Sequence, residues 1–172
     1  MTTIEDNKLA WSPITPLANL LKEESKEQEK DVHRVRFSVA GVSQESQTPS
    51  KCVKVYDTKS NAIREISPKK ESLGKNEKYV LCLTLFVKDF SNMLTNQFLV
   101  VNVIDKDETF FKDIGSKPAD FVTGTKASKT KAAEKLTAVL DTLTKFNVWV
   151  EAGVARQNDH FVVTDSTHLK VF

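Results

Sequence analysis

The sequence has few of the residues that brace or interrupt a small fold. Its 172 residues include 2 cysteines, 5 glycines, 5 prolines and 3 histidines. Cys52 and Cys82 lie far apart, and the N-terminus lacks the basic start and apolar stretch of a secretory signal, so we expect two free thiols in an intracellular protein. Because the cysteines and histidines are scattered, they lack the spacing of a structural zinc site. We therefore expect no metal and no other cofactor.

Long apolar runs and catalytic motifs are also missing. No stretch reaches the ~20 apolar residues that a membrane-spanning helix needs. The net charge of +2 is too small to indicate nucleic-acid binding by itself. No Walker loop, GxGxxG, HExxH or GxSxG motif occurs, and no two carboxylates are arranged for acid–base work. These absences favour a binding protein over an enzyme.

The first part of the chain, residues 1–31, is interpreted as an arm. Pro13 and Pro16 interrupt regular structure, and the leucines that follow have helical spacing before a run of mixed charges. This pattern predicts a short amphipathic helix. Trp11 is apolar enough to need cover, either from the rest of the protein or from a partner. Residues 32–172 are interpreted as one domain.

Alternating and helical patterns follow one another in that domain. Alternation of apolar and polar residues, or β-rich composition, predicts strands, and an apolar stripe at helical spacing predicts one helix. The predicted strands cover residues 32–42, 79–89, 97–105, 147–156 and 160–165, and the predicted helix covers 127–146. Residues 52–57 and 61–66 are weaker strand candidates. Gly41 is expected at a bend or bulge.

The order of these elements is β-β-β-α-β-β. Three strands, a helix and a terminal hairpin is the order of the OB-fold, a partly open barrel that offers its second and third strands and two loops to ligands. We therefore predict an all-β domain: a five-stranded OB-fold barrel capped by one helix, with a short N-terminal helical arm.

Several stretches resemble a known family. LTLFVKD (83–89), LTKFNVWVEAGVARQNDHFVVTDSTHL (143–169) and the pair Phe110–Phe111 are similar to the C-terminal OB domain of the ciliate telomere end-binding protein alpha subunit, a relative of the protection-of-telomeres family. SPITPLANLL in the arm is similar to the segment that precedes that domain. The resemblance implies a nuclear protein at chromosome telomeres.

The same resemblance implies a division of labour. In that family two upstream OB domains bind single-stranded G-rich telomeric DNA, whereas the C-terminal OB domain holds a partner subunit, the beta subunit in ciliates. Animal members carry an inserted domain and a zinc site. This sequence has neither the necessary length between residues 106 and 128 nor the cysteines, so no zinc site is carried over.

Two functional hypotheses follow. The first is a protein–protein module of an end-capping complex, in which aromatic side chains anchor the partner. Each of these aromatics could instead pack in a core. The candidate partner-binding residues are Phe110, Phe111, Trp149, Phe86 and Trp11.

The alternative is direct binding of single-stranded DNA, which needs a basic groove interleaved with aromatics on which bases stack. The second and third predicted strands supply mostly leucine and valine, so we favour the protein partner. The residues available for DNA are Arg34, Arg36, Lys54, Tyr56, Lys88 and Arg156.

Overall fold

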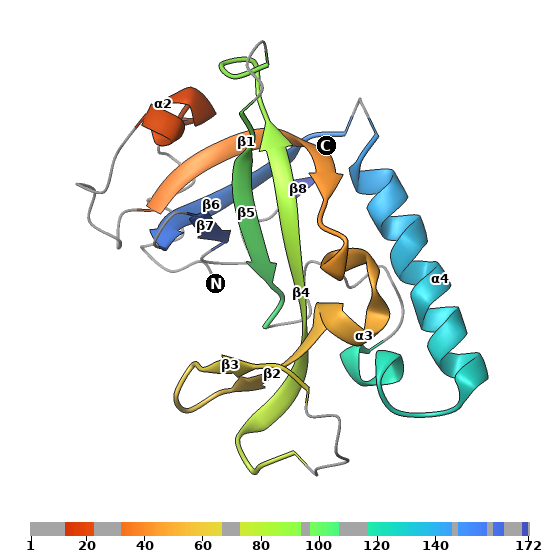
Figure 1. Cartoon of the computed structure of the whole chain (residues 1–172). Coiled ribbons are helices and arrows are strands. Elements are labelled where there is room, and N and C mark those ends of the chain that lie inside the picture. Colours follow the sequence, from red (N-terminus) through yellow and green to blue (C-terminus); the bar gives the residue numbers. More distant parts are fainter. Residues whose placement is uncertain are drawn as a thin grey trace.

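Five strands form the body of the protein (Figure 1). The computed structural model describes residues 13–22, 32–66, 73–93, 97–106, 117–145, 148–157, 160–163 and 170–171. The barrel strands are β1 (Val32–Val42), β4 (Glu77–Lys88), β5 (Leu99–Ile104), β6 (Val150–Gln157) and β7 (His160–Val163).

The five strands close into a ring. β1 pairs antiparallel with β4, β4 with β5, β6 with β7 and β1 with β6, while β5 and β7 pair in parallel. Helix α4 (Lys126–Leu143) lies in the chain between β5 and β6. A closed ring with this strand order and a helix after its third strand is the OB-fold. The fold predicted from the sequence is therefore confirmed.

β1 pairs with two neighbouring strands, and this double pairing closes the barrel. Its first half, from Val32 to Phe37, pairs with β6, and its second half, from Ser38 to Val42, pairs with β4. The register shifts between Val39 and Gly41. A bulge of this kind bends and twists a strand, so it carries β1 from one neighbour to the next. The bend predicted at Gly41 is confirmed.

Apolar side chains alternate toward the inside of the ring. In β4 the odd-numbered residues from Leu81 to Val87 are buried, and the even-numbered residues between them are half-buried on the outside. β5 repeats this pattern from Leu99 to Ile104. Burial of every second residue is the period-2 pattern from which the strands were predicted. The inward residues of the other strands include Val35, Phe37, Val39, Val150, Ala152, Val154, Phe161 and Val163.

Helix α4 packs on the barrel through one stripe. Its buried residues are Ala132, Leu136, Leu140 and Leu143, and all four belong to the main apolar core. The helix begins one residue before the predicted start, and Thr125 caps it: Thr125 Oγ1 accepts from Ser128 N at 3.1 Å. A 3₁₀ turn, η3 (Pro118–Phe121), precedes the helix and buries Phe121.

The arm contributes α2 (Leu17–Lys22), which is the predicted short helix, and it docks on the barrel. Leu17 and Leu20 are buried in the main core. Leu17 N donates to Asp89 Oδ2 at 2.9 Å, and Arg156 Nη2 donates to the Leu20 carbonyl at 2.8 Å. In Figure 1, α2 and α4 lie on opposite sides of the barrel.

An additional hairpin branches from the barrel below the ring in Figure 1. It follows η1 (Glu45–Gln47) and α3 (Pro49–Cys52), and consists of β2 (Val53–Asp57) and β3 (Ile63–Arg64). β2 pairs with the first half of β4. A last short strand, β8 (Lys170–Val171), pairs with β6. None of the helices in the described ranges is long and apolar enough to cross a membrane.

Candidate binding groove

The outer face of β4 and β5 forms a groove of about 380 Å³. We use "the groove" for this hollow, whose floor is Cys82 and Thr84 of β4, Asn102 and Ile104 of β5, and Val162 of β7. Its position follows from the strand pattern, because these are the side chains that alternate away from the core. In an OB-fold this face is the usual ligand site.

The middle of the floor is a polar pair. Thr84 and Asn102 lie opposite each other across the two strands, and the Thr84 hydroxyl donates to Asn102 Oδ1 at 2.8 Å. Because the amide oxygen of Asn102 is engaged in this way, its NH₂ group is the donor that the floor can offer to a ligand.

The loop after β1 forms one wall. Ser43 N donates to the Thr84 carbonyl at 3.0 Å, and Thr84 N donates to Ser46 Oγ at 2.8 Å. Ser43 and Ser46 are also hydrogen-bonded to each other at 2.8 Å. The buried Ser46 therefore continues the hydrogen-bond ladder of β4 beyond the end of β1. These bonds hold the wall in place before any ligand binds.

The β2–β3 hairpin forms the other wall with Lys54, Asn61 and Ile63. Asn61 has a positive φ of 60°, a conformation that asparagine tolerates better than most residues. The Tyr56 hydroxyl donates to Asn61 Oδ1 and so braces the turn from inside. Lys54 forms an ion pair with the exposed Glu65.

Charges on the rim nearly cancel. Lys51 and Lys54 stand against Glu45 on the rim, and Lys54 is already paired with Glu65. The floor itself contains no ionised side chain among its described residues. A rim of this kind does not supply the run of cations that follows a nucleic-acid backbone.

The Cys82 thiol on the groove floor and the buried Cys52 thiol are protonated. Burial raises the pKa of Cys82 to about 12 and that of Cys52 to about 11. Both are free cysteines, as expected from the sequence. Since the thiolate is the reactive form of cysteine, neither residue has the properties of a nucleophile.

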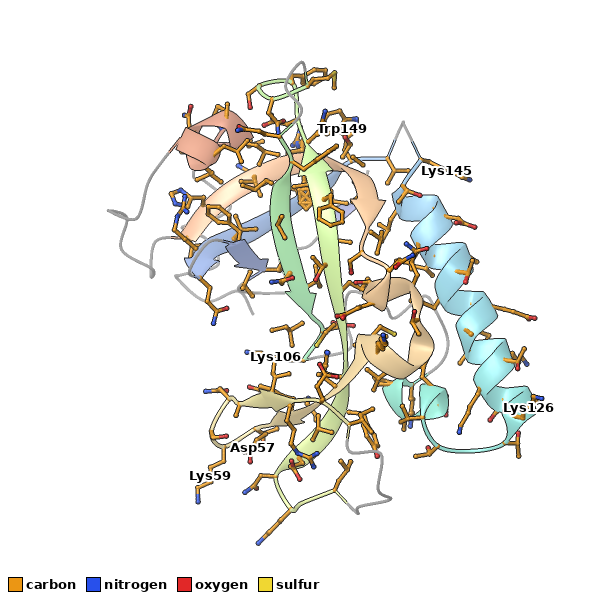
Figure 2. The ribbon with its side chains drawn as sticks, viewed as in Figure 1. Asp57, Lys59, Lys106, Lys126, Lys145 and Trp149 are labelled. Atoms are coloured by element: carbon orange, nitrogen blue, oxygen red, sulfur yellow. The ribbon has the colours of Figure 1, made fainter. Side chains whose placement is uncertain are left out.

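Aromatic side chains lie at both ends of the groove. At one end Phe86 and Phe98 contact edge to face at 6.5 Å, and Lys88 Nζ lies 4.6 Å from the Phe98 ring centre. At the other end Lys106 Nζ lies 5.0 Å from the Tyr56 ring centre. Figure 2 shows Lys106 in the lower part of the molecule with the hairpin, well away from Trp149.

The predicted partner-binding residues are not all together. Phe86 is half-buried on the outside of β4, so it is not a core residue. Trp149 lies at the start of β6, where its ring stacks on Phe90 at 5.2 Å. Phe110, Phe111 and Trp11 lie outside the described residues.

The residues predicted for DNA binding separate into two groups. Lys54, Tyr56 and Lys88 lie along or beside the groove. The three arginines make contacts within the fold instead: Arg34 and Arg36 approach Glu151 Oε1 at 2.5 and 3.6 Å, and Arg156 lies over the Phe161 ring at 4.8 Å. The structure therefore does not unite the six residues on one surface.

Sequence reasoning missed most of the groove floor. Thr84, Asn102 and Cys82 are ordinary strand residues, and only their outward phase along two neighbouring strands marks them. The serine wall depends on contacts across 38 positions of sequence, from Ser46 to Thr84, which no local pattern reveals. Within the described ranges, no group of three or more His, Cys, Asp or Glu residues is placed to hold a metal ion.

No protein-family model matches the chain, and a search of curated proteins finds no match.

Proposed function

We propose that this chain is a non-enzymatic OB-fold module that binds a segment of a protein partner in its groove, as part of a telomere end-capping complex. The observation that carries the proposal is the groove on the outer face of β4 and β5, with a neutral floor centred on Thr84 and Asn102. The partner is a subunit comparable to the beta subunit of the ciliate complex, and the setting is the nucleus.

The character of the groove supports a peptide ligand. Apolar floor residues such as Ile104 and Val162 suit small apolar side chains, and the amide of Asn102 suits a backbone carbonyl. The rim offers both signs of charge. An extended segment can use all three features, since its side chains alternate while its backbone presents regular donors and acceptors.

The telomeric setting rests on the sequence resemblance. The stretches that carry it include β4, as LTLFVKD, and the β6–β7 hairpin. These are three of the five barrel strands, and two of them supply part of the groove floor. The family's C-terminal OB domain holds a partner subunit, and we extend that role to this chain.

The test is recovery of a partner from the cells in which the chain occurs. A tagged full chain is compared with Asn102→Arg, which places a long cation over the middle of the floor. The matched control is Thr137→Arg, on the exposed face of α4. We expect the wild type and the control to recover the same telomeric protein, and Asn102→Arg to recover at least tenfold less.

Circular dichroism should show the same fold for all three proteins, since Asn102 is only half-buried. Recovery of that protein at the wild-type level by Asn102→Arg would remove the groove from the proposal. Partners unrelated to chromosome ends would remove the telomeric setting.

A second candidate is single-stranded DNA in the same groove. It is favoured by the two lysine–aromatic pairs, Lys88 with Phe98 and Lys106 with Tyr56, because stacking rings beside cations are what such sites use. Titration with a fluorescent G-rich oligonucleotide separates the candidates. Micromolar or tighter binding that weakens steeply with salt would favour DNA. We expect no binding in that range, because none of the three arginines lines the groove.

A further inference from the structure

A second hollow, of about 590 Å³, lies away from the groove at the start of β6. We call it the aromatic hollow. Its walls include Ile14 and Pro16 from the arm, Arg36 from β1, Phe90 from the turn after β4, and Trp149. A volume in this range is that of ordinary ligand pockets. None of these residues lines the groove.

The main wall is an aromatic pair that faces solvent. Phe90 is 82 % exposed, although its ring is stacked on Trp149 with an interplanar angle of 26°. Ile14, in the same hollow, is 38 % exposed, and Met93 on the same turn is 42 % exposed. Exposed apolar residues that lie together around a hollow are typical of contact surfaces, and aromatics are frequent anchors there.

The walls are held in place before any ligand binds. Asp89 is buried, and its carboxylate accepts from Leu17 N at 2.9 Å and from Ser91 N at 2.8 Å. Ser91 Oγ in turn accepts from Ala18 N at 2.9 Å. These bonds join the arm to the turn that carries Phe90. A site fixed in this way loses less conformational entropy when it binds.

Among the described residues, the charge that the hollow presents to solvent is positive. The side chain of Arg36 is 44 % exposed. The two carboxylates nearby are covered, with Asp89 7 % and Glu151 5 % exposed. Glu151 Oε1 is also held more closely by Arg34, at 2.5 Å, than by Arg36, at 3.6 Å. The exposed guanidinium therefore complements a carboxylate on whatever fills the hollow.

We propose that the aromatic hollow is a second docking site, and that it binds an acidic peptide segment that inserts one aromatic or leucine side chain. The inserted side chain packs against the stacked rings of Phe90 and Trp149 and against Ile14. A neighbouring carboxylate of the peptide pairs with Arg36. A nucleic acid fits less well, because one guanidinium among apolar walls does not follow a phosphate backbone. The site is separate from the groove, so both can be occupied at once.

The test is selection of random twelve-residue peptides, displayed on phage, against the full chain. We expect enriched peptides to place an aromatic residue or leucine within three positions of Asp or Glu. Synthetic copies should bind Phe90→Ala at least tenfold more weakly and Arg36→Gln at least threefold more weakly than wild type. The matched control is Val32→Ala, which alters an exposed apolar residue that lines neither site.

Two further measurements keep the outcomes distinct. Thermal unfolding should leave Phe90→Ala within 2 °C of wild type, since its ring is mostly exposed. Binding of the same peptides to Asn102→Arg should be unchanged. Peptides that bind Phe90→Ala as well as wild type, or that lose affinity for Asn102→Arg instead, would overturn the proposal. So would concentration-dependent dimerisation that Phe90→Ala abolishes, because the occupant would then be a second copy.

Discussion

The groove and the aromatic hollow differ in how the chain builds them. The groove floor comes mainly from β4 and β5, two strands that are neighbours in the barrel and are paired along the whole length of β5. The hollow combines four segments that are distant in sequence: the arm, β1, the turn after β4 and the start of β6. The groove depends on the alternation of side chains along paired strands. The hollow depends on hydrogen bonds and packing between segments that are distant in sequence.

This difference has a physical consequence. A groove on a sheet persists as long as the ladder persists, because each floor residue is positioned by its own strand. Two wall residues of the hollow, Ile14 and Pro16, come directly before α2, and α2 is short. An isolated helix of this length is not stable in water, so its packing and its hydrogen bonds to the barrel must hold it. Variants that release α2 should therefore displace the arm walls of the hollow and spare the groove.

The largest effect is expected from Leu17→Ala. Leu17 is fully buried in the main core, and removal of a buried leucine side chain costs about 3 kcal/mol through lost burial and a residual cavity. Urea unfolding measures this loss. Leu21, which only packs against the core from outside, is the control, and Leu21→Ala should cost about 1 kcal/mol. Equal and small effects would mean that α2 is not part of the core.

Asp89→Ala should have the next largest effect. It removes the acceptor for Leu17 N and Ser91 N in a buried site, which should cost about 2 kcal/mol of unfolding free energy. Asp57→Ala is a matched control: its carboxylate also accepts two backbone N–H groups, from Lys59 and Ser60, but in an exposed turn. There water can replace the carboxylate, so we expect a loss below about 1 kcal/mol.

In the same Asp89→Ala protein, binding of the selected acidic peptides should fall and recovery of the groove partner should not. Loss of both activities together would contradict the independence of the two sites.

The smallest effect concerns the buried thiol of Cys52. The pKa of Cys52 is about 11 in the folded protein because of burial, which is above its ordinary value of 9.0. The folded state therefore disfavours the thiolate: the stabilisation is complete below pH 9 and is lost as the pH rises through 11. Between pH 8 and pH 10 this thiol alone should account for a loss of about 1 kcal/mol.

Urea unfolding of wild type and Cys52→Ala at both pH values measures the difference. The variant should lose less stability than the wild type on going to pH 10, whatever its stability at pH 8. An equal loss in the two proteins would show that the Cys52 thiol does not contribute.

The sequence predicted what depends on periodicity. Alternation in β4 and β5 and the stripe of α4 led to the closed barrel, and Gly41 marked the bend in β1. The position of Thr125 as the helix cap was missed, because several hydroxyl residues compete at that end. Phe90 was missed because it lies in a turn, where no helical or strand periodicity marks a residue. Its neighbour Trp149 also lies far away in sequence.

Contacts between distant residues account for the rest. The contacts of Arg34 and Arg36 with Glu151, which lies more than a hundred positions away in the sequence, could not be predicted from local patterns. The clamp of Asp89 on the arm spans 72 positions and follows no local rule. Local patterns thus predict which face of a strand is outward, but not which outward residues are already engaged.

The most direct test of the groove as the partner site is a nuclear magnetic resonance titration of the isotopically labelled chain with the recovered partner. We expect the amide signals of Thr84, Asn102 and Val162 to shift, and those of the exposed face of α4 around Thr137 to stay in place. Shifts confined to α4, with the signals of Thr84 and Asn102 unchanged at saturation, would contradict the account.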